Sequence, residues 1–126
     1  MTTEHTWPST LWIVRHGESA GNVAREAAYQ ASKAKIDLNL RDIDVPLSER
    51  GKQQARALGH WFGKQPEESR PTAILTSPYL RALDTAELIR ESAGLDVDRV
   101  TTTCDERLRE KEFGILDKLT RDGIAQ

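Results

Sequence analysis

Residues 11–19 read LWIVRHGES, and this short stretch already indicates the class of fold. Four apolar residues in a row, 11–14, are typical of a strand that is covered on both faces of a parallel sheet. The run stops at Arg15-His16-Gly17, and an alanine-rich stretch then favours a helix over residues 19–35. A strand that leads through a polar loop into a helix is the repeating unit of α/β proteins.

The same alternation continues downstream. Apolar residues at helical spacing after Ser48 predict a helix over residues 48–64. Residues 73–76 predict a second buried strand, residues 80–93 a helix that Gly94 ends, and residues 99–103 a further strand. We therefore expect an α/β fold, with a mainly parallel sheet and flanking helices. Two polar segments are expected as a lead-in and a loop, namely residues 1–10 and 36–46.

The composition limits the classes of protein to consider. A chain of 126 residues fits one domain, which we expect over residues 11–126. With 18 Lys and Arg against 20 Asp and Glu, the net charge of −2 argues against nucleic acid as a partner. We also expect no membrane span, no export signal and a cytoplasmic location, because the chain lacks a long apolar run and its single cysteine, Cys104, cannot form an internal disulfide. A homo-oligomer is possible.

Two polar loops follow predicted strands, where parallel sheets hold their ligands. One contains Arg15 and Gly17, and the other leads to Arg81. Arginine binds phosphate through two parallel hydrogen bonds, and a glycine lets the backbone approach a ligand closely. The two loops therefore predict a site for a phosphate dianion, although Arg81 taken alone is typical of an ion-paired surface residue.

His16 is the candidate nucleophile of this site. A neutral imidazole can attack phosphorus, and arginines can neutralise the transferring group without a metal or another cofactor, so we expect neither. Hydrolysis also needs a proton donor for the leaving oxygen. The residues alone leave four candidates for that role, namely Asp105, Glu106, Glu110 and Glu112.

Four ordered motifs resemble those of one family, the histidine phosphatase superfamily, which includes the cofactor-dependent phosphoglycerate mutases. They are RHGES at residues 15–19 with Asn22, DVPLSERG at residues 44–51, TSPYLRA at residues 76–82 with Thr85, and LRE at residues 108–110 followed by Phe113-Gly114. The resemblance implies a phosphoglycerate mutase-like fold.

The resemblance also implies a role for each matching residue. His16 would be the phosphorylated nucleophile, Arg15 and Arg81 the phosphate clamp, and Glu110 the proton donor and acceptor. Asn22, Ser19 and the backbone of Gly17 would be secondary phosphate contacts, although Ser19 is also typical of a helix N-cap. The implied substrate is a small phosphate monoester.

The sequence departs from the family pattern in one respect. Family members carry a second histidine in a late His-Gly motif, and this chain has none, so it resembles the amino-terminal part of the family's domain. Such a part would leave a sheet edge and apolar helix faces uncovered. The expected activity is hydrolysis through a phosphohistidine. Phosphoglycerate mutase ranks second, because residues 23–43 and 108–112 depart from the mutase form, and a catalytically inactive phosphate-binding module ranks third.

Overall fold

The computed structural model describes residues 7–110, 118–120 and 123. In this part of the chain the element order is α1 (Ala20–Gln30), η1 (Asp42–Asp44), α2 (Glu49–Gly63), η2 (Glu67–Ser69), β1 (Ala73–Thr76), α3 (Leu80–Ala93), β2 (Thr101–Cys104) and η3 (Glu106–Leu108), where η marks short 3₁₀ helices. β1 and β2 are parallel, and α3 connects them. The predicted α/β class is therefore confirmed.

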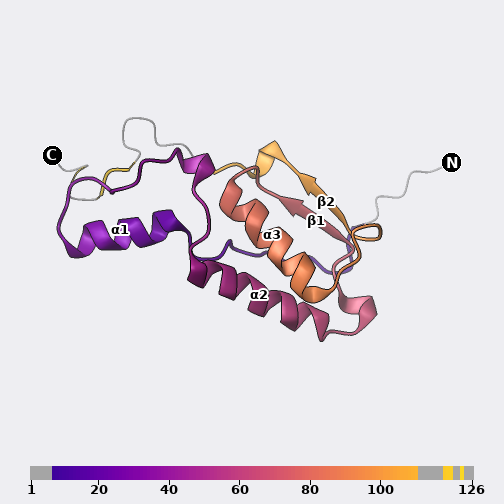
Figure 1. Cartoon of the computed structure of the whole chain (residues 1–126). Coiled ribbons are helices and arrows are strands. Elements are labelled where there is room, and N and C mark those ends of the chain that lie inside the picture. The colour runs from indigo at the N-terminus through magenta and orange to yellow at the C-terminus, as the bar shows by residue number, and fades with distance from the viewer. Residues whose placement is uncertain (1–6, 111–117, 121–122, 124–126) are drawn as a thin grey trace.

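The elements that position the site are layered around α3. Helix α3 lies between α2 and the β1–β2 pair, whereas α1 extends away from these elements (Figure 1). The register pairs Ala73 with Thr101 at one end and Thr76 with Cys104 at the other. β1 ends at Thr76 and α3 begins at Leu80, so the carboxyl end of β1 leads directly into the short loop before α3.

Local signals set the bounds of α2 and α3. Ser48 is the N-cap of α2, and its side chain accepts a hydrogen bond from the backbone of Gly51. Gly94 ends α3 in the left-handed conformation, with a φ of 68°, as a C-terminal glycine commonly does.

Helix α1 ends at Gln30, earlier than the predicted residue 35. It buries only Ala28, so little tertiary packing stabilises a longer helix.

The prediction that residues 11–14 form a buried strand is wrong for the described part of the chain. These residues belong to no strand, and the Ile13 side chain is 91% exposed. A strand needs a hydrogen-bonded neighbour, and β1 pairs with β2 alone among the described segments. Trp12 instead contacts α2, where its ring meets Trp61 and Phe62 edge-on at 5.4 Å each.

The two strands are also more exposed than predicted. Every residue of β2 is exposed, and Leu75 of β1 is 64% exposed. The strand predicted over residues 99–103 forms over Thr101–Cys104, while Val100 is buried just before it. The described helices thus cover the sheet only partly, which agrees with the expectation of an uncovered sheet edge.

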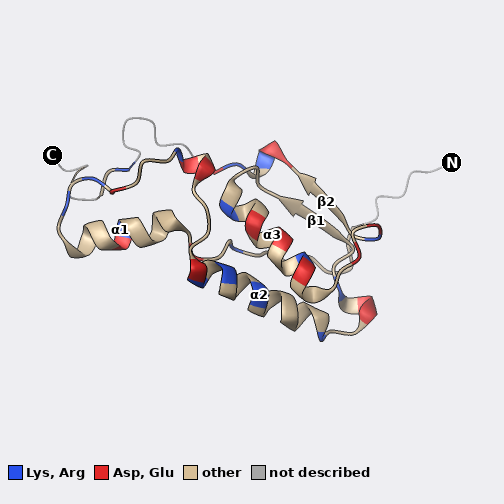
Figure 2. Cartoon of the chain, viewed as in Figure 1, with Lys and Arg blue, Asp and Glu red and all other residues tan. Residues whose placement is uncertain are grey.

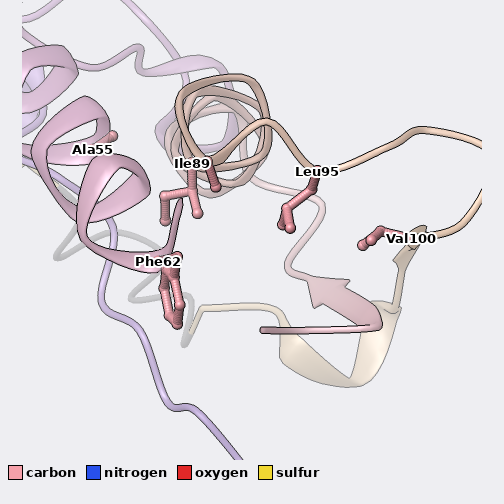
Figure 3. Packing of buried hydrophobic residues seen from close by; sticks show 6 residues of the cluster. Ala55, Phe62, Ile89, Leu95 and Val100 are labelled. Atoms are coloured by element: carbon pink, nitrogen blue, oxygen red, sulfur yellow. The ribbon is translucent and has the colours of Figure 1, made fainter. Parts of the chain in front are cut away.

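The main core lies between α2, α3 and the segment that leads into β2. It contains Ala55 and Phe62 of α2, Ile89 and Ala93 of α3, and two residues after α3, Leu95 and Val100 (Figure 3). Gly59 brings the two helices close together. A Cβ placed there would lie 2.6 Å from Ser92 Cβ and 2.7 Å from the Ile89 carbonyl oxygen.

The acidic position of α2 lies at its start and basic positions follow it, whereas α3 carries both acidic and basic positions along its length (Figure 2). Every buried side-chain nitrogen and oxygen among the described residues has a hydrogen-bond partner. Within the same residues, no helix has the length and apolar character that a membrane span requires.

Replacing Gly59 with alanine tests the contact between α2 and α3. Helix propensity alone would make the alanine variant about 1 kcal/mol more stable. Because the added methyl group would meet α3, we expect instead a loss of about 1–3 kcal/mol in the free energy of unfolding, measured by urea denaturation. Gln53→Ala, at an exposed position of the same helix, is the control and should change stability by less than about 0.5 kcal/mol. A more stable Gly59→Ala variant would contradict this packing.

Candidate functional site

His16 lies in the loop between residues 11–14 and α1. Its ring is partly buried, and Nδ1 is 2.6 Å from the carbonyl oxygen of Gly17. A carbonyl oxygen only accepts hydrogen bonds, so Nδ1 carries the proton in this contact. In the neutral ring the lone pair then resides on Nε2. This arrangement leaves Nε2 as the nitrogen that can act as a nucleophile.

The loop of His16 is hydrogen-bonded to the first turns of α3. The buried backbone N–H of Gly17 donates to Thr85 Oγ1 at 3.1 Å, and Thr85 Oγ1 donates to the carbonyl oxygen of Arg81 at 2.7 Å. Thr85 therefore links the backbone beside His16 to the backbone of Arg81. The two loops that the sequence predicts to meet are joined by this contact.

The same loop is fixed against the start of α2. Glu18 accepts hydrogen bonds from Ser48 through both its carbonyl oxygen and its carboxylate, and its N–H donates to Gln54. The backbones approach so closely that a Cβ on Gly51 would lie 1.9 Å from the Glu18 carbonyl oxygen. Gly51 is therefore required here by lack of space.

Arg81 is a nearly buried cation at the start of α3, with a side chain that is only 9% exposed. Its Nη1 donates to the carbonyl oxygen of Asp42 at 2.8 Å and to Asp42 Oδ1 at 3.0 Å. Its Nη2 lies 3.5 Å from Asp42 Oδ2 and 3.6 Å from Glu110 Oε1. The guanidinium also stacks over the buried ring of Tyr79, 4.8 Å from the ring centre. The buried charge of Arg81, on α3, thus contacts both η1 and Glu110.

The described acidic candidates differ in which arginine each one contacts. Asp105 accepts hydrogen bonds from the side chain and backbone of Arg107, and these lower the pKa of its carboxyl group to about 2. A group held ionised in this way is a poor proton donor near neutral pH. Glu106 and Glu110 also lie beside arginines, Glu106 at 3.1 Å from Arg109 and Glu110 at 3.6 Å from Arg81, so Glu110 differs from the others in that its partner is the buried cation. Glu112 lies outside the described residues.

The remaining predicted contacts differ in what they can offer a ligand. Ser19 and Asn22 form a reciprocal N-terminal cap of α1, in which each side chain accepts a hydrogen bond from the other's backbone at 3.0 Å. Ser19 is buried in this role, and Asn22 uses its Oδ1 in the cap, so its NH₂ group takes no part in that contact. Arg15 lies in the loop of His16 and is exposed.

Two site residues were given no role from the sequence. Thr85 belongs to one of the quoted motifs, so the motif itself was a usable signal. Asp42 lies in a polar loop with several acidic residues, and nothing in its spacing distinguishes it from Asp37 or Asp44. Its contact with Arg81 depends on tertiary packing across 39 residues of chain. Among the described residues, no cluster of His, Cys, Asp and Glu side chains could hold a metal ion.

Comparison with known proteins places this geometry in context. Residues 11–126 match the model of the histidine phosphatase superfamily (branch 1). The "probable phosphoglycerate mutase GpmB" of Salmonella paratyphi C is 31% identical over 116 residues, which cover 92% of this chain and 44% of that protein. This chain thus spans less than half the length of that relative.

Solved structures are also similar to most of this chain but to less than half of their own chains. A mycobacterial hydrolase is 31% identical, with a TM-score of 0.59 over 86% of this chain and 42% of its own. Mycobacterial glucosyl-3-phosphoglycerate phosphatase, solved with VO₃, is 30% identical, with a TM-score of 0.55 and the same coverage. The protein histidine phosphatase SixA, solved with tungstate, shares the fold at 22% identity, with a TM-score of 0.52 over 74% of this chain and 46% of its own.

Replacing Thr85 with valine tests the link between the two loops. Valine has nearly the shape of threonine but cannot accept the hydrogen bond from Gly17, whose N–H is buried. We expect a loss of about 1–3 kcal/mol in the free energy of unfolding, measured by urea denaturation. Thr85→Ser keeps the hydroxyl group and should retain most of this stability. Equal losses in the two variants would show that the hydroxyl is not what stabilises the loop.

Proposed function

The chain belongs to the histidine phosphatase superfamily (branch 1), and from this premise we propose that it hydrolyses phosphate monoesters through a phosphohistidine at His16. The observation that carries the proposal is the connection of the His16 loop, through Gly17 and Thr85, to Arg81, which contacts Glu110. These are the residues that a phosphoenzyme reaction needs: a nucleophile, an anion-binding cation and a carboxyl group.

In the first step, Nε2 of His16 attacks phosphorus and the ester P–O bond breaks. Nδ1 keeps its proton through the hydrogen bond to the Gly17 carbonyl, so the ring attacks in the tautomer that the structure has. Arg81, with Arg15, would neutralise the charge on the phosphoryl oxygens. Protonated Glu110 would give its proton to the departing alcohol oxygen.

In the second step, water attacks the phosphohistidine. Glu110, now a carboxylate, would accept a proton from this water, and the P–N bond breaks to release inorganic phosphate. The enzyme returns with a neutral His16 and a protonated Glu110. Asn22 would contact the phosphate through its NH₂ group, next to the backbone of Gly17.

Phosphoglycerate mutase activity is a second candidate, which the name of the Salmonella relative favours. It would use the same nucleophile and clamp, but the phosphohistidine would pass its phosphoryl group to a sugar acid in place of water. The phosphatase reading is supported by the mycobacterial phosphatase, which is similar over most of this chain.

Substitution of His16 is the direct test of the phosphoenzyme. We expect His16→Ala to lower kcat for hydrolysis of 4-nitrophenyl phosphate by about a thousandfold or more, because the substitution removes the proposed nucleophile. His60→Ala is the matched control, since His60 is exposed on α2, and it should keep the parental rate. Parental activity in His16→Ala would refute the mechanism. Phosphate binding without turnover in the parent chain would favour the inactive binding module.

A second assay separates the phosphatase from the mutase. We expect 3-phosphoglycerate, supplied with its bisphosphate primer, to release inorganic phosphate, because water is the proposed acceptor. Phosphate release is measured by colorimetry and isomerisation by ³¹P NMR. Fast isomerisation without phosphate release would establish the mutase instead. The His16→Ala variant is the control for background hydrolysis in both readouts.

A further inference from the structure

Oxygens of Asp42 and Glu110 already surround the two terminal nitrogens of the Arg81 guanidinium. Each terminal nitrogen of an arginine carries two N–H groups. Both N–H groups of Nη1 are taken by Asp42, one by its carbonyl oxygen at 2.8 Å and one by Oδ1 at 3.0 Å. Nη2 has the second Asp42 oxygen at 3.5 Å and Glu110 Oε1 at 3.6 Å. A phosphate that binds both terminal nitrogens would compete with these oxygens.

We propose that Asp42 competes with substrate for the phosphate-binding nitrogens of Arg81. The substrate phosphate must displace the Asp42 carboxylate in order to bind there. The inference rests on the proposed function, because it takes Arg81 as the phosphate clamp. The Asp42 carboxylate spans Nη1 and Nη2 as a phosphate would, so the two anions exclude each other.

The burial of the two partners indicates which one moves. The Arg81 side chain is 9% exposed and stacks on Tyr79, so it is held in place. The Asp42 side chain is 43% exposed and belongs to a three-residue 3₁₀ helix within the connection between α1 and α2. An incoming anion can therefore approach the ion pair from the side of Asp42. Replacement of the Asp42 carboxylate by that anion requires η1 to shift, while α3 stays in place.

This competition makes Asp42 a specificity-determining residue. Replacing one singly charged carboxylate with another monoanion changes little in the Coulomb energy at Arg81. A phosphoryl dianion brings twice the charge and so gains from the exchange. Asp42 should thus suppress the binding of carboxylates and other monoanions while it permits dianionic phosphate esters.

The test compares Asp42→Asn with Asp44→Asn, using the full 126-residue chain. Asp44 lies in the same η1 but pairs with exposed Arg41, so its variant is the matched control. Isothermal titration with inorganic phosphate should show about fivefold tighter binding for Asp42→Asn. This fold-change corresponds to the loss of one strong ion pair between residue 42 and Arg81, which phosphate would no longer have to break. Asp44→Asn should bind like the parent. Acetate binding should increase in Asp42→Asn as well.

The outcomes separate this proposal from the proposed function. Unchanged or weaker phosphate binding in Asp42→Asn, and also in Asp42→Ala, would overturn the competitor role if both variants melt cooperatively. Arg81→Gln provides the second arm, because it removes the clamp itself. If Arg81→Gln loses phosphate affinity while the Asp42 variants gain none, the clamp stands and the competition fails. If Arg81→Gln binds phosphate like the parent, Arg81 is not the phosphate clamp, and the competitor role of Asp42 fails with it.

NMR gives an independent readout of whether η1 responds when phosphate binds. The Asp44 backbone N–H, at the end of η1, donates to the carbonyl oxygen of the N-cap residue Arg41 at 2.9 Å. Titration of the parent chain with phosphate should shift this amide resonance as η1 leaves Arg81. An amide that stays in place when phosphate saturates the site would overturn the proposed displacement.

Discussion

A single buried positive charge, the guanidinium of Arg81, is the constraint on which this site depends. Removing such a charge from water is costly unless anions and hydrogen-bond acceptors surround it. Asp42, Glu110 and the ring of Tyr79 meet this demand from three different parts of the chain. Their positions are consequently coupled, because a change in any one of them alters the surroundings of the same cation. The site is in this sense organised around an electrostatic requirement, and the hydrophobic contact of α2 with α3 supports it from one side.

The elements that could be predicted from the sequence are those with strong local signals. Helices α2 and α3 show apolar spacing together with a serine N-cap or a glycine C-cap, and β1 forms at the predicted residues. Residues 11–14 have an equally clear apolar pattern but form no strand, since a strand depends on a hydrogen-bonded neighbour that local sequence cannot specify. Helix α1 has good propensity yet buries only Ala28, which explains why it is shorter than expected.

The site shows the same division. The expected proximity of the His16 loop to Arg81 agrees with the contact through Thr85, although the argument for it placed a strand at residues 11–14 that does not form in the described structure. Asp42 could not be identified in this way, since its role arises from the folding of a long connection back onto α3. Ser19 could be identified as an N-cap from its residue type, whereas its reciprocal pairing with Asn22 was not predicted. Motifs therefore indicate the candidate catalytic groups, whereas the contact of Asp42 with Arg81 depends on packing.

The aromatic contact of Trp12 with α2 has an optical consequence. Trp12 and Trp61 lie edge to face, 5.4 Å apart, next to Phe62, whereas Trp7 is 86% exposed. Indole emission depends on the polarity around the ring, so two of the three tryptophans report on whether the residues before the His16 loop rest on α2. The third contributes a solvent-exposed background. Intrinsic fluorescence can thus follow the seating of this segment in the unlabelled protein, without a dye or an introduced probe.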